Sequence, residues 1–273
     1  MIDIVSHNRA AWDQQSSEGQ SPWVRPVSAS IIEAARQGNW SLILTPNKPV
    51  PAAWFGDLAG RDVLALASGG GQQAPVLAAA GAVVTSFDNS PVQLAKDRQV
   101  ADRDNLEIRI ELGDMADLSR FKDSSFDLIF HPVSNLYAQD IKPVWQECFR
   151  VLRPGGRLLA GFMNPSIFLF DLDNIEAGEP LRVAFALPYS DTEGLAEADL
   201  QTRIAANEGL EFSHTLTDQI GGQLAAGFQL TGFYEDGWDD ASLALNRYMD
   251  SSMATLAIKP LGNTRFPPQA AQS

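Results

Sequence analysis

Residues 62–71, with the sequence DVLALASGGG, decide the fold class of this 273-residue chain. The apolar run 62–67 predicts a short buried strand, and three glycines follow it directly. Residues 72–80 then have the pattern of a helix, which Gly81 ends. A strand, a glycine turn and a helix in this order are typical of a parallel sheet that binds ligands beyond the carboxyl ends of its strands.

Strands and helices continue to alternate on the carboxyl side of this unit. Because strands separated by helices pair in parallel and are covered on both faces, the pattern predicts an α/β fold with a doubly wound, mostly parallel sheet. The further predicted strands are 82–87, 106–112, 126–130, 157–162, 229–234 and 254–258, and the further helices are 90–102, 142–152 and 217–226.

The remaining segments divide the chain into five parts. Residues 1–53 form a leader rich in tryptophan and proline, with short helices predicted at 8–15 and from Ser28 or Ser30 to Gln37. Residues 164–213 interrupt the alternation, and two strands, 181–187 and 210–214, around a helix at 197–207 predict a small inserted flap. The core therefore comprises residues 54–163 and 214–259, and 260–273 is a tail.

The composition limits the partners of the chain. Its net charge is −14, which disfavours nucleic acid and anionic membranes as partners. No apolar run is long enough to span a bilayer, and the polar start lacks a signal peptide, so we expect a cytoplasmic protein. With only Cys148 and three scattered histidines, we expect no metal site.

The glycine turn and the strand that follows it have the residues of a nucleotide site. Gly69, Gly70 and Gly71 let the backbone pass close to a ligand, and Asp88 ends the next strand 17 residues after Gly71. A carboxylate there accepts both ribose hydroxyls of an adenosine. The pair fits either a nicotinamide cofactor or S-adenosylmethionine, and a plain tight turn beside a surface aspartate is the structural alternative.

The end of the third strand points to the same ligand. Asp114 follows Gly113 there, so its carboxylate is expected at the same edge of the sheet as Asp88. This carboxylate can accept a hydrogen bond from an adenine amino group, with Met115 against the ring. The structural alternative is a helix cap.

Two further motifs follow along the chain, and the order of all the motifs is that of a known protein family. Residues 126–130 read FDLIF and residues 151–159 read VLRPGGRLL. Together with the glycine turn, Asp88 and the Gly113–Asp114 pair, they resemble the class I S-adenosylmethionine-dependent methyltransferases, especially the small-molecule branch that includes ubiquinone-biosynthesis-like enzymes. The resemblance covers about residues 62–162.

The resemblance implies a Rossmann-like sheet of seven strands, the last antiparallel, that binds S-adenosylmethionine. It implies in-line methyl transfer to a small-molecule acceptor, with the leader as a helical lid. Trp12 or Trp23 would exclude water there, and simple helix packing is the alternative for both. The expected cofactor contacts are Ser68, Gly69, Gly70, Gly71, Gln72, Asp88, Asn89, Asp114, Met115 and His131.

Two positions depart from the family pattern. Ala65 stands in place of the usual first-motif aspartate, and Ala67 in place of the usual first glycine. We therefore expect the contact to the methionine end of the cofactor to be weakened or to shift to Ser68, Gln72 or the leader. The departures leave a non-catalytic cofactor-binding scaffold as one alternative, and a nicotinamide-dependent oxidoreductase is the other.

The loop 131–137, with the sequence HPVSNLY, follows the fourth strand and is expected to border the reacting methyl group. His131 is a candidate general base and Tyr137 a second candidate catalytic residue, and a buried histidine that orders the loop is the alternative. Acceptor contacts are expected from this loop and from the flap.

The oligomeric state cannot be predicted from the sequence. The flap phenylalanines, which form either an acceptor face or simply core, are Phe168, Phe170, Phe185 and Phe212.

Overall fold

The computed structural model describes residues 2–19, 21–239 and 244–262, so most of the predicted tail lies outside the described residues. A single seven-stranded sheet with the order β3-β2-β1-β4-β5-β7-β6 forms its centre. Strands β1 to β5 pair in parallel, whereas β7 is antiparallel to both β5 and β6. The predicted seven-stranded, mostly parallel sheet is thereby confirmed. The strands are β1 (Asp62–Leu66), β2 (Val83–Asp88), β3 (Ile108–Leu112), β4 (Phe126–His131), β5 (Leu152–Met163), β6 (Gln229–Asp236) and β7 (Ser252–Ile258).

Local signals set the helix ends. In α5, for example, the Ser90 hydroxyl accepts the Gln93 N–H at 3.0 Å, Pro91 begins the first turn and Asn105 ends the helix in the left-handed conformation. The α-helices are α1 (Ile4–Glu18), α2 (Ala29–Arg36), α3 (Ala52–Phe55), α4 (Gln73–Ala79), α5 (Pro91–Asp104), α6 (Lys142–Val151), α7 (Leu172–Glu176), α8 (Asp191–Gly194), α9 (Glu197–Ala205) and α10 (Gly222–Ala226). Shorter 3₁₀ turns are Pro22–Val24, Asn135–Tyr137, Pro165–Leu169 and Ala244–Arg247, and a π turn, Thr217–Gly221, precedes α10.

Strand β1 is buried on both faces. Val63 and Ala65 pack in the core under α2 and α4, whereas Leu64 and Leu66 pack in the core under α6. Successive side chains of a strand point to opposite faces, so a strand between two helical layers needs apolar residues at nearly every position. This explains why the opening strand reads as a continuous apolar run.

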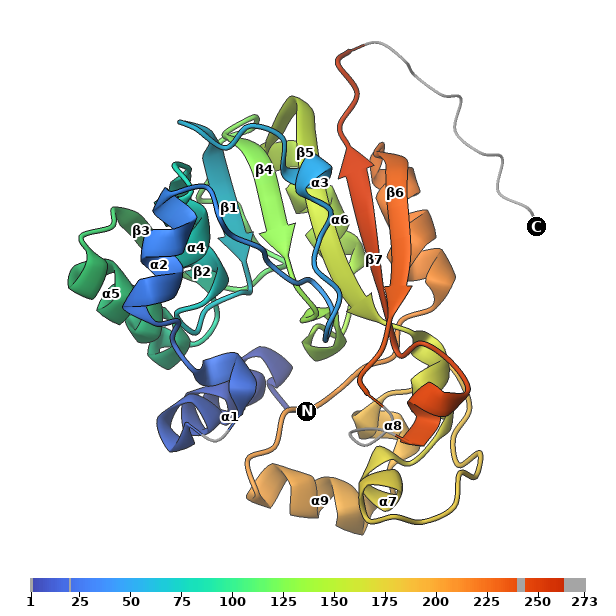
Figure 1. Ribbon diagram of the computed structural model, residues 1–273. Coiled ribbons are helices and arrows are strands. Elements are labelled where there is room, and N and C mark those ends of the chain that lie inside the picture. The colour runs from blue at the N-terminus through green and yellow to red at the C-terminus, as the bar shows by residue number, and fades with distance from the viewer. Residues whose placement is uncertain (1, 20, 240–243, 263–273) are drawn as a thin grey trace.

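The leader and the insertion meet beyond the carboxyl ends of the parallel strands (Figure 1). Helix α1 starts earlier than the predicted helix 8–15 because the Asp3 carboxylate caps it, accepting the Ser6 N–H at 3.1 Å. In the insertion, α9 confirms the predicted helix at 197–207. None of the helices in the described ranges combines the length and apolar character needed to cross a bilayer.

The two strands predicted for the flap are wrong. Residues 181–187 make only one isolated bridge, between Phe170 and Val183, and residues 210–214 make only the bridge between Ser190 and Phe212. Neither segment has a neighbouring strand along which to extend a ladder, and Val183 remains 71% exposed. The insertion is therefore a set of short helices and loops around two small apolar clusters.

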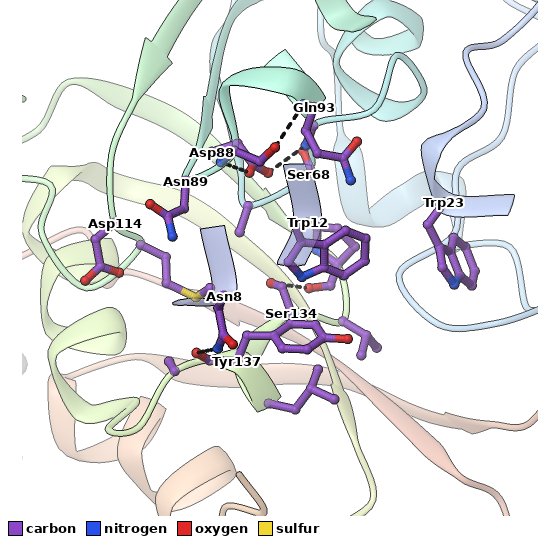
Figure 2. Close-up of a pocket in the computed structure, with 18 of the residues that line it drawn as sticks. Asn8, Trp12, Trp23, Ser68, Asp88, Asn89, Gln93, Asp114, Ser134 and Tyr137 are labelled. Carbon is purple, nitrogen blue, oxygen red and sulfur yellow. Dashed lines mark hydrogen bonds between the residues drawn. The ribbon is translucent and has the colours of Figure 1, made fainter. Parts of the chain in front are cut away.

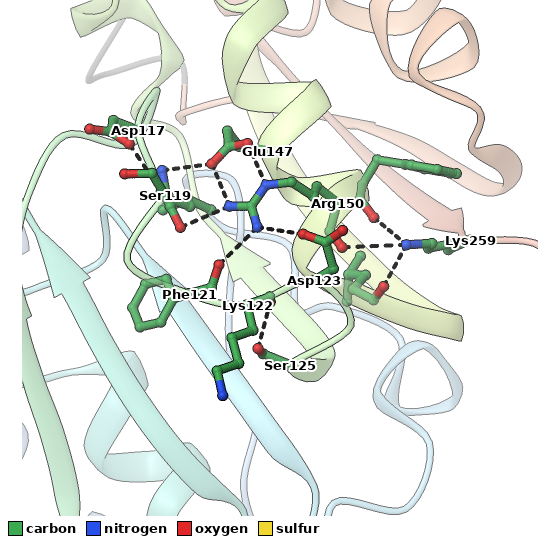
Figure 3. A network of polar contacts seen from close by, with 12 residues as sticks. Asp117, Ser119, Phe121, Lys122, Asp123, Ser125, Glu147, Arg150 and Lys259 are labelled. Carbon is green, nitrogen blue, oxygen red and sulfur yellow. Dashed lines mark hydrogen bonds and ion pairs between the residues drawn. The ribbon is translucent and has the colours of Figure 1, made fainter.

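A polar network fixes the connection between β3 and β4 (Figure 3). The Arg150 guanidinium donates to the carbonyls of Leu118 and Phe121 at 2.9 and 2.8 Å. At the end of α6, the Lys259 ammonium donates to the carbonyls of Phe149 and Leu152, both at 2.7 Å. The last carbonyls of a helix lack partners within it, so Lys259, which follows β7, satisfies the Phe149 carbonyl and ties the end of α6 to the sheet.

Candidate active site

A cavity of about 810 Å³ lies along the carboxyl edge of the sheet. It extends from the ends of β2 and β3, at Asp88 and Asp114, past the end of β1 to Val133, Met163 and Ser252 at the edge of β4, β5 and β7. This is the edge at which doubly wound folds bind ligands, and the volume is near the upper end of the roughly 300–1,000 Å³ of small-molecule sites. Helix α1 and the residues that follow it cover the cavity.

Asp88 is held rigidly at the end of β2 (Figure 2). One carboxylate oxygen accepts the Gly69 N–H at 3.0 Å, and the other accepts the Ser90 N–H at 2.9 Å. Burial raises the pKa of this carboxyl, and the backbone hydrogen bonds oppose the rise. Because each oxygen can accept a second hydrogen bond, the oriented carboxylate can receive two hydroxyl groups from a ligand in the cavity.

The glycine turn is tied to the protein rather than open to a ligand. Besides the Gly69 bond to Asp88, the Gly70 N–H donates to the Gln93 carbonyl at 3.1 Å and the Gly71 N–H donates to the Asp97 carboxylate at 2.7 Å. Only Gly69 of the three lines the cavity. Added side chains at Gly70 and Gly71 would meet the leader at Trp23 and Pro26, so this close approach explains the two glycines.

Two buried polar atoms beside the turn have no hydrogen-bond partner within the described structure. They are Ser68 Oγ and Gln93 Oε1, on side chains that are 4% and 5% exposed and that line the cavity. A buried polar group without a partner costs about 1–3 kcal/mol, so a polar ligand group that reached these atoms would be stabilised there. Sequence reasoning named Ser68 and missed Gln93.

The end of β3 meets the same cavity. Both Asp114 and Met115 line it, and Asp114 Oδ1 accepts the Ala116 N–H at 3.1 Å. Gly113 lies against the Phe87 ring so closely that no side chain would fit there. The structure therefore brings Asp88 and Asp114 to one site, as the sequence predicts.

His131 lies outside the cavity lining, behind the loop that follows β4. It is fully buried, with Nδ1 3.0 Å from the Leu66 carbonyl, Nε2 2.6 Å from Asn135 Oδ1 and the ring edge-on to Trp145. Burial lowers the pKa of the imidazole despite these hydrogen bonds. With both nitrogens engaged inside the protein, the geometry favours the alternative of a histidine that orders the loop over a base or a cofactor contact.

Tyr137 does line the cavity, with its ring edge-on to Trp12 at 5.4 Å between ring centroids (Figure 2). Burial raises the pKa of its hydroxyl well above the usual range, and the charges of Glu211 and Asp191 and a hydrogen bond to Glu211 raise it further. The phenol therefore stays protonated and acts as a hydrogen-bond donor rather than a base. Glu211 also lines the cavity and was missed from the sequence.

Helix α1 is fastened over the cavity from both sides. The Asn8 amide donates to the carbonyls of Tyr137 and Leu210, each at 3.0 Å, and accepts the Leu210 N–H at 2.8 Å. On the other side, Arg9 Nε donates to Asn89 Oδ1 at 3.0 Å. The predicted contact residue Asn89 thus lines the cavity while holding the helix that covers it.

Gln72 lines the cavity, but its amide holds the leader by donating to the Pro22 and Arg25 carbonyls at 2.7 and 2.9 Å.

The flap phenylalanines form apolar core rather than an acceptor face. Phe168, Phe170 and Phe185 belong to one apolar cluster of the insertion and Phe212 to the other, and none is among the cavity-lining residues.

Comparison with known proteins agrees with this geometry. A family model described as a methyltransferase domain matches residues 64–160. The chain is 48% identical over 259 residues to the uncharacterized methyltransferase YbaJ of Bacillus subtilis (strain 168), covering 95% of this chain and all of that protein. It is 34% identical over 170 residues to a demethylmenaquinone methyltransferase of Tropheryma whipplei, covering 62% of this chain and 66% of the relative.

Solved structures share the fold. A putative S-adenosylmethionine-dependent methyltransferase from Listeria monocytogenes aligns with a TM-score of 0.60 at 15% identity, over 84% of this chain and 99% of the other. One from Mesorhizobium loti aligns with a TM-score of 0.57 at 18% identity, over 76% and 94%. These matches give the oxidoreductase and scaffold alternatives no support. Strand order and relatives agree, and the chain belongs to the methyltransferase family.

Proposed function

We propose that the protein transfers the methyl group of S-adenosylmethionine to a small molecule bound in the same covered cavity. The observation that carries the proposal is the extent of the cavity, which joins the carboxylates Asp88 and Asp114 to the apolar side chains of Val133 and Met163. One end provides for a nucleoside, and the other has space for an acceptor.

The residues present fit the cofactor. We assign the ribose hydroxyls to Asp88, whose two oxygens are already oriented by backbone amides. Asp114 and Met115 would hold the adenine. The unpaired atoms of Ser68 and Gln93, beside Gly69, suit the polar methionine end. They take the place of the family aspartate, because Ala65 is buried in the core.

The chain's own residues contribute mainly positioning. The cofactor supplies an activated methyl group, and alignment of the two reactants can be worth about 7–11 kcal/mol. Asn8 and Arg9 hold α1 over the cavity, which excludes water from the reactants. His131 fixes the loop that carries Tyr137, so we propose it as a positioning residue.

A small acceptor is favoured over a macromolecule because α1 and the insertion cover the cavity. The acidic balance of the chain also repels nucleic acids, and we expect the enzyme to act in the cytoplasm. The demethylmenaquinone methyltransferase among the relatives is named for a small-molecule acceptor, in accord with this proposal.

Methyl-labelled S-adenosylmethionine tests the proposal directly. The protein is incubated at subsaturating cofactor concentration with the small-molecule, protein and nucleic-acid fractions of a bacterial extract in turn, with Asp88→Ala as the control of weakened cofactor binding. We expect label in the small-molecule fraction only. Transfer to protein or nucleic acid instead, or equal labelling by Asp88→Ala, would contradict it.

A further inference from the structure

The cavity has aromatic walls. Trp23 and Trp238 lie 5.5 Å apart at an interplanar angle of 59°, and Trp12 meets Tyr137 edge-on. All four rings line the cavity and are partly exposed to it. They come from the leader, the loop after β4 and the segment after β6, so folding assembles them from distant parts of the chain.

The charges around the cavity are mostly negative. Among the described lining residues there are five carboxylates and a single guanidinium, that of Arg9, whose Nε is bound to Asn89. An anionic acceptor would therefore meet net repulsion, and Arg9 is the one cationic side chain among the described lining residues. The carboxylates, in order, are Asp3, Asp88, Asp114, Asp140 and Glu211.

Among the described lining residues, the five carboxylates are the candidate bases, and a carboxylate is a weak base for an alcohol. Histidine is absent from this lining, and His131 is fully buried with both nitrogens engaged. The Tyr137 phenol is hydrogen-bonded to Glu211 and kept protonated. An alcohol, which does not lose its proton to water near neutral pH, finds little assistance, whereas an ammonium group can release its proton to water before transfer and then offers a free lone pair.

From these three features we infer that the acceptor is an amine with a flat, apolar body. The body lies against the tryptophans, and Glu211 and the aromatic faces stabilise positive charge on nitrogen. The inference rests on the proposed function, because it assigns the substrate class of the same site.

The reaction balances without a further reactant. The ammonium form of the amine first releases a proton to water. The nitrogen lone pair then forms a bond to the methyl carbon while the carbon–sulfur bond breaks and its electron pair stays on sulfur. The positive charge passes from sulfonium to nitrogen, where Glu211 and the aromatic rings remain favourable partners.

Three probes of matched size test the inference: 2-phenylethylamine, 2-phenylethanol and 3-phenylpropanoate. Each is titrated into the full-length protein saturated with S-adenosylhomocysteine, and binding is followed by calorimetry. We expect the amine to bind about tenfold more tightly than the alcohol, and the carboxylate not to bind measurably. Equal or tighter binding of the carboxylate, or failure of the amine to bind at millimolar concentration, would overturn the inference.

Variants show whether the named groups are responsible. Glu211→Gln should reduce the preference for amine over alcohol by about tenfold, whereas Glu193→Gln, an exposed carboxylate outside the cavity lining, should leave it unchanged. Trp238→Ala should weaken amine and alcohol together. An unchanged preference in Glu211→Gln contradicts the amine assignment. Failure of the wild-type protein to bind S-adenosylhomocysteine would instead refute the proposed function itself, so the two failures are distinguishable.

Discussion

Replacing Asp97 by asparagine should stabilise the protein at pH 8 and do so progressively less at lower pH. Asp97 lies on α5, is fully buried and accepts the Gly71 N–H at 2.7 Å and the Ser86 hydroxyl at 2.6 Å. Burial, reinforced by the charge of Asp88, raises its pKa from 3.8 to about 7. Asparagine keeps the shape and an acceptor for Gly71, and its amide can donate to Ser86, so only the buried charge is lost.

The magnitude follows from linkage. The folded protein holds a proton on Asp97 more tightly than the unfolded chain, so its contribution makes the free energy of unfolding fall as pH rises from about 4 to 7. Each pKa unit corresponds to about 1.4 kcal/mol, so the ionised group lowers stability by up to about 4 kcal/mol. The advantage of Asp97→Asn should therefore grow by about 2–3 kcal/mol between pH 5 and pH 8.

Urea unfolding of both proteins at several pH values measures this difference. Asp102→Asn, on an exposed position of the same helix, is the matched control and should not reproduce the gain. Free energies of unfolding for Asp97→Asn and wild type that differ by a constant amount from pH 5 to pH 8 would refute the reasoning. So would a variant that is less stable than wild type at pH 8.

Three further predictions concern the site and its cover. Asp88→Ala should weaken S-adenosylhomocysteine binding by about 1–3 kcal/mol because charge-assisted hydrogen bonds are lost, and unchanged affinity in calorimetry would remove Asp88 from the site. Ala67 has a φ of 48°, so Ala67→Gly should raise the unfolding free energy by about 0.5–1 kcal/mol, and a lower urea midpoint would contradict this. Asn8→Ala should cost about 1–3 kcal/mol of local stability by breaking the bonds to Tyr137 and Leu210, seen as faster amide hydrogen exchange in α1; unchanged exchange would show that other contacts hold the helix.

The sheet and the meeting of its two carboxylates could be predicted because the carboxyl ends of parallel strands all lie at the same edge of a sheet. Asp88 ends β2 and Asp114 follows β3 at the same edge, so their meeting follows from fold class alone. The antiparallel position of β7 came only from the family resemblance. The prediction of two strands in the flap was wrong because residues that favour β structure form a strand only where another strand lies beside them to pair with.

Side-chain direction in irregular segments was the least predictable feature. His131 ends a strand as Asp88 does, but its ring turns inward beneath the loop. The glycine triplet predicts close approach, yet only packing shows that Gly70 approaches the leader rather than a ligand. The burial of Asp97 could have been predicted from the helical spacing, because it shares the core-facing side of its helix with Leu94 and Val100.

Calorimetric titration of the protein with S-adenosylhomocysteine, with NADH and NADPH in parallel, tests the central claim most directly. The cavity from Asp88 to Asp114 predicts micromolar binding of S-adenosylhomocysteine and no measurable binding of either nicotinamide. Binding of a nicotinamide cofactor, or of none of the three, would contradict the account of this cavity as a methyltransferase site.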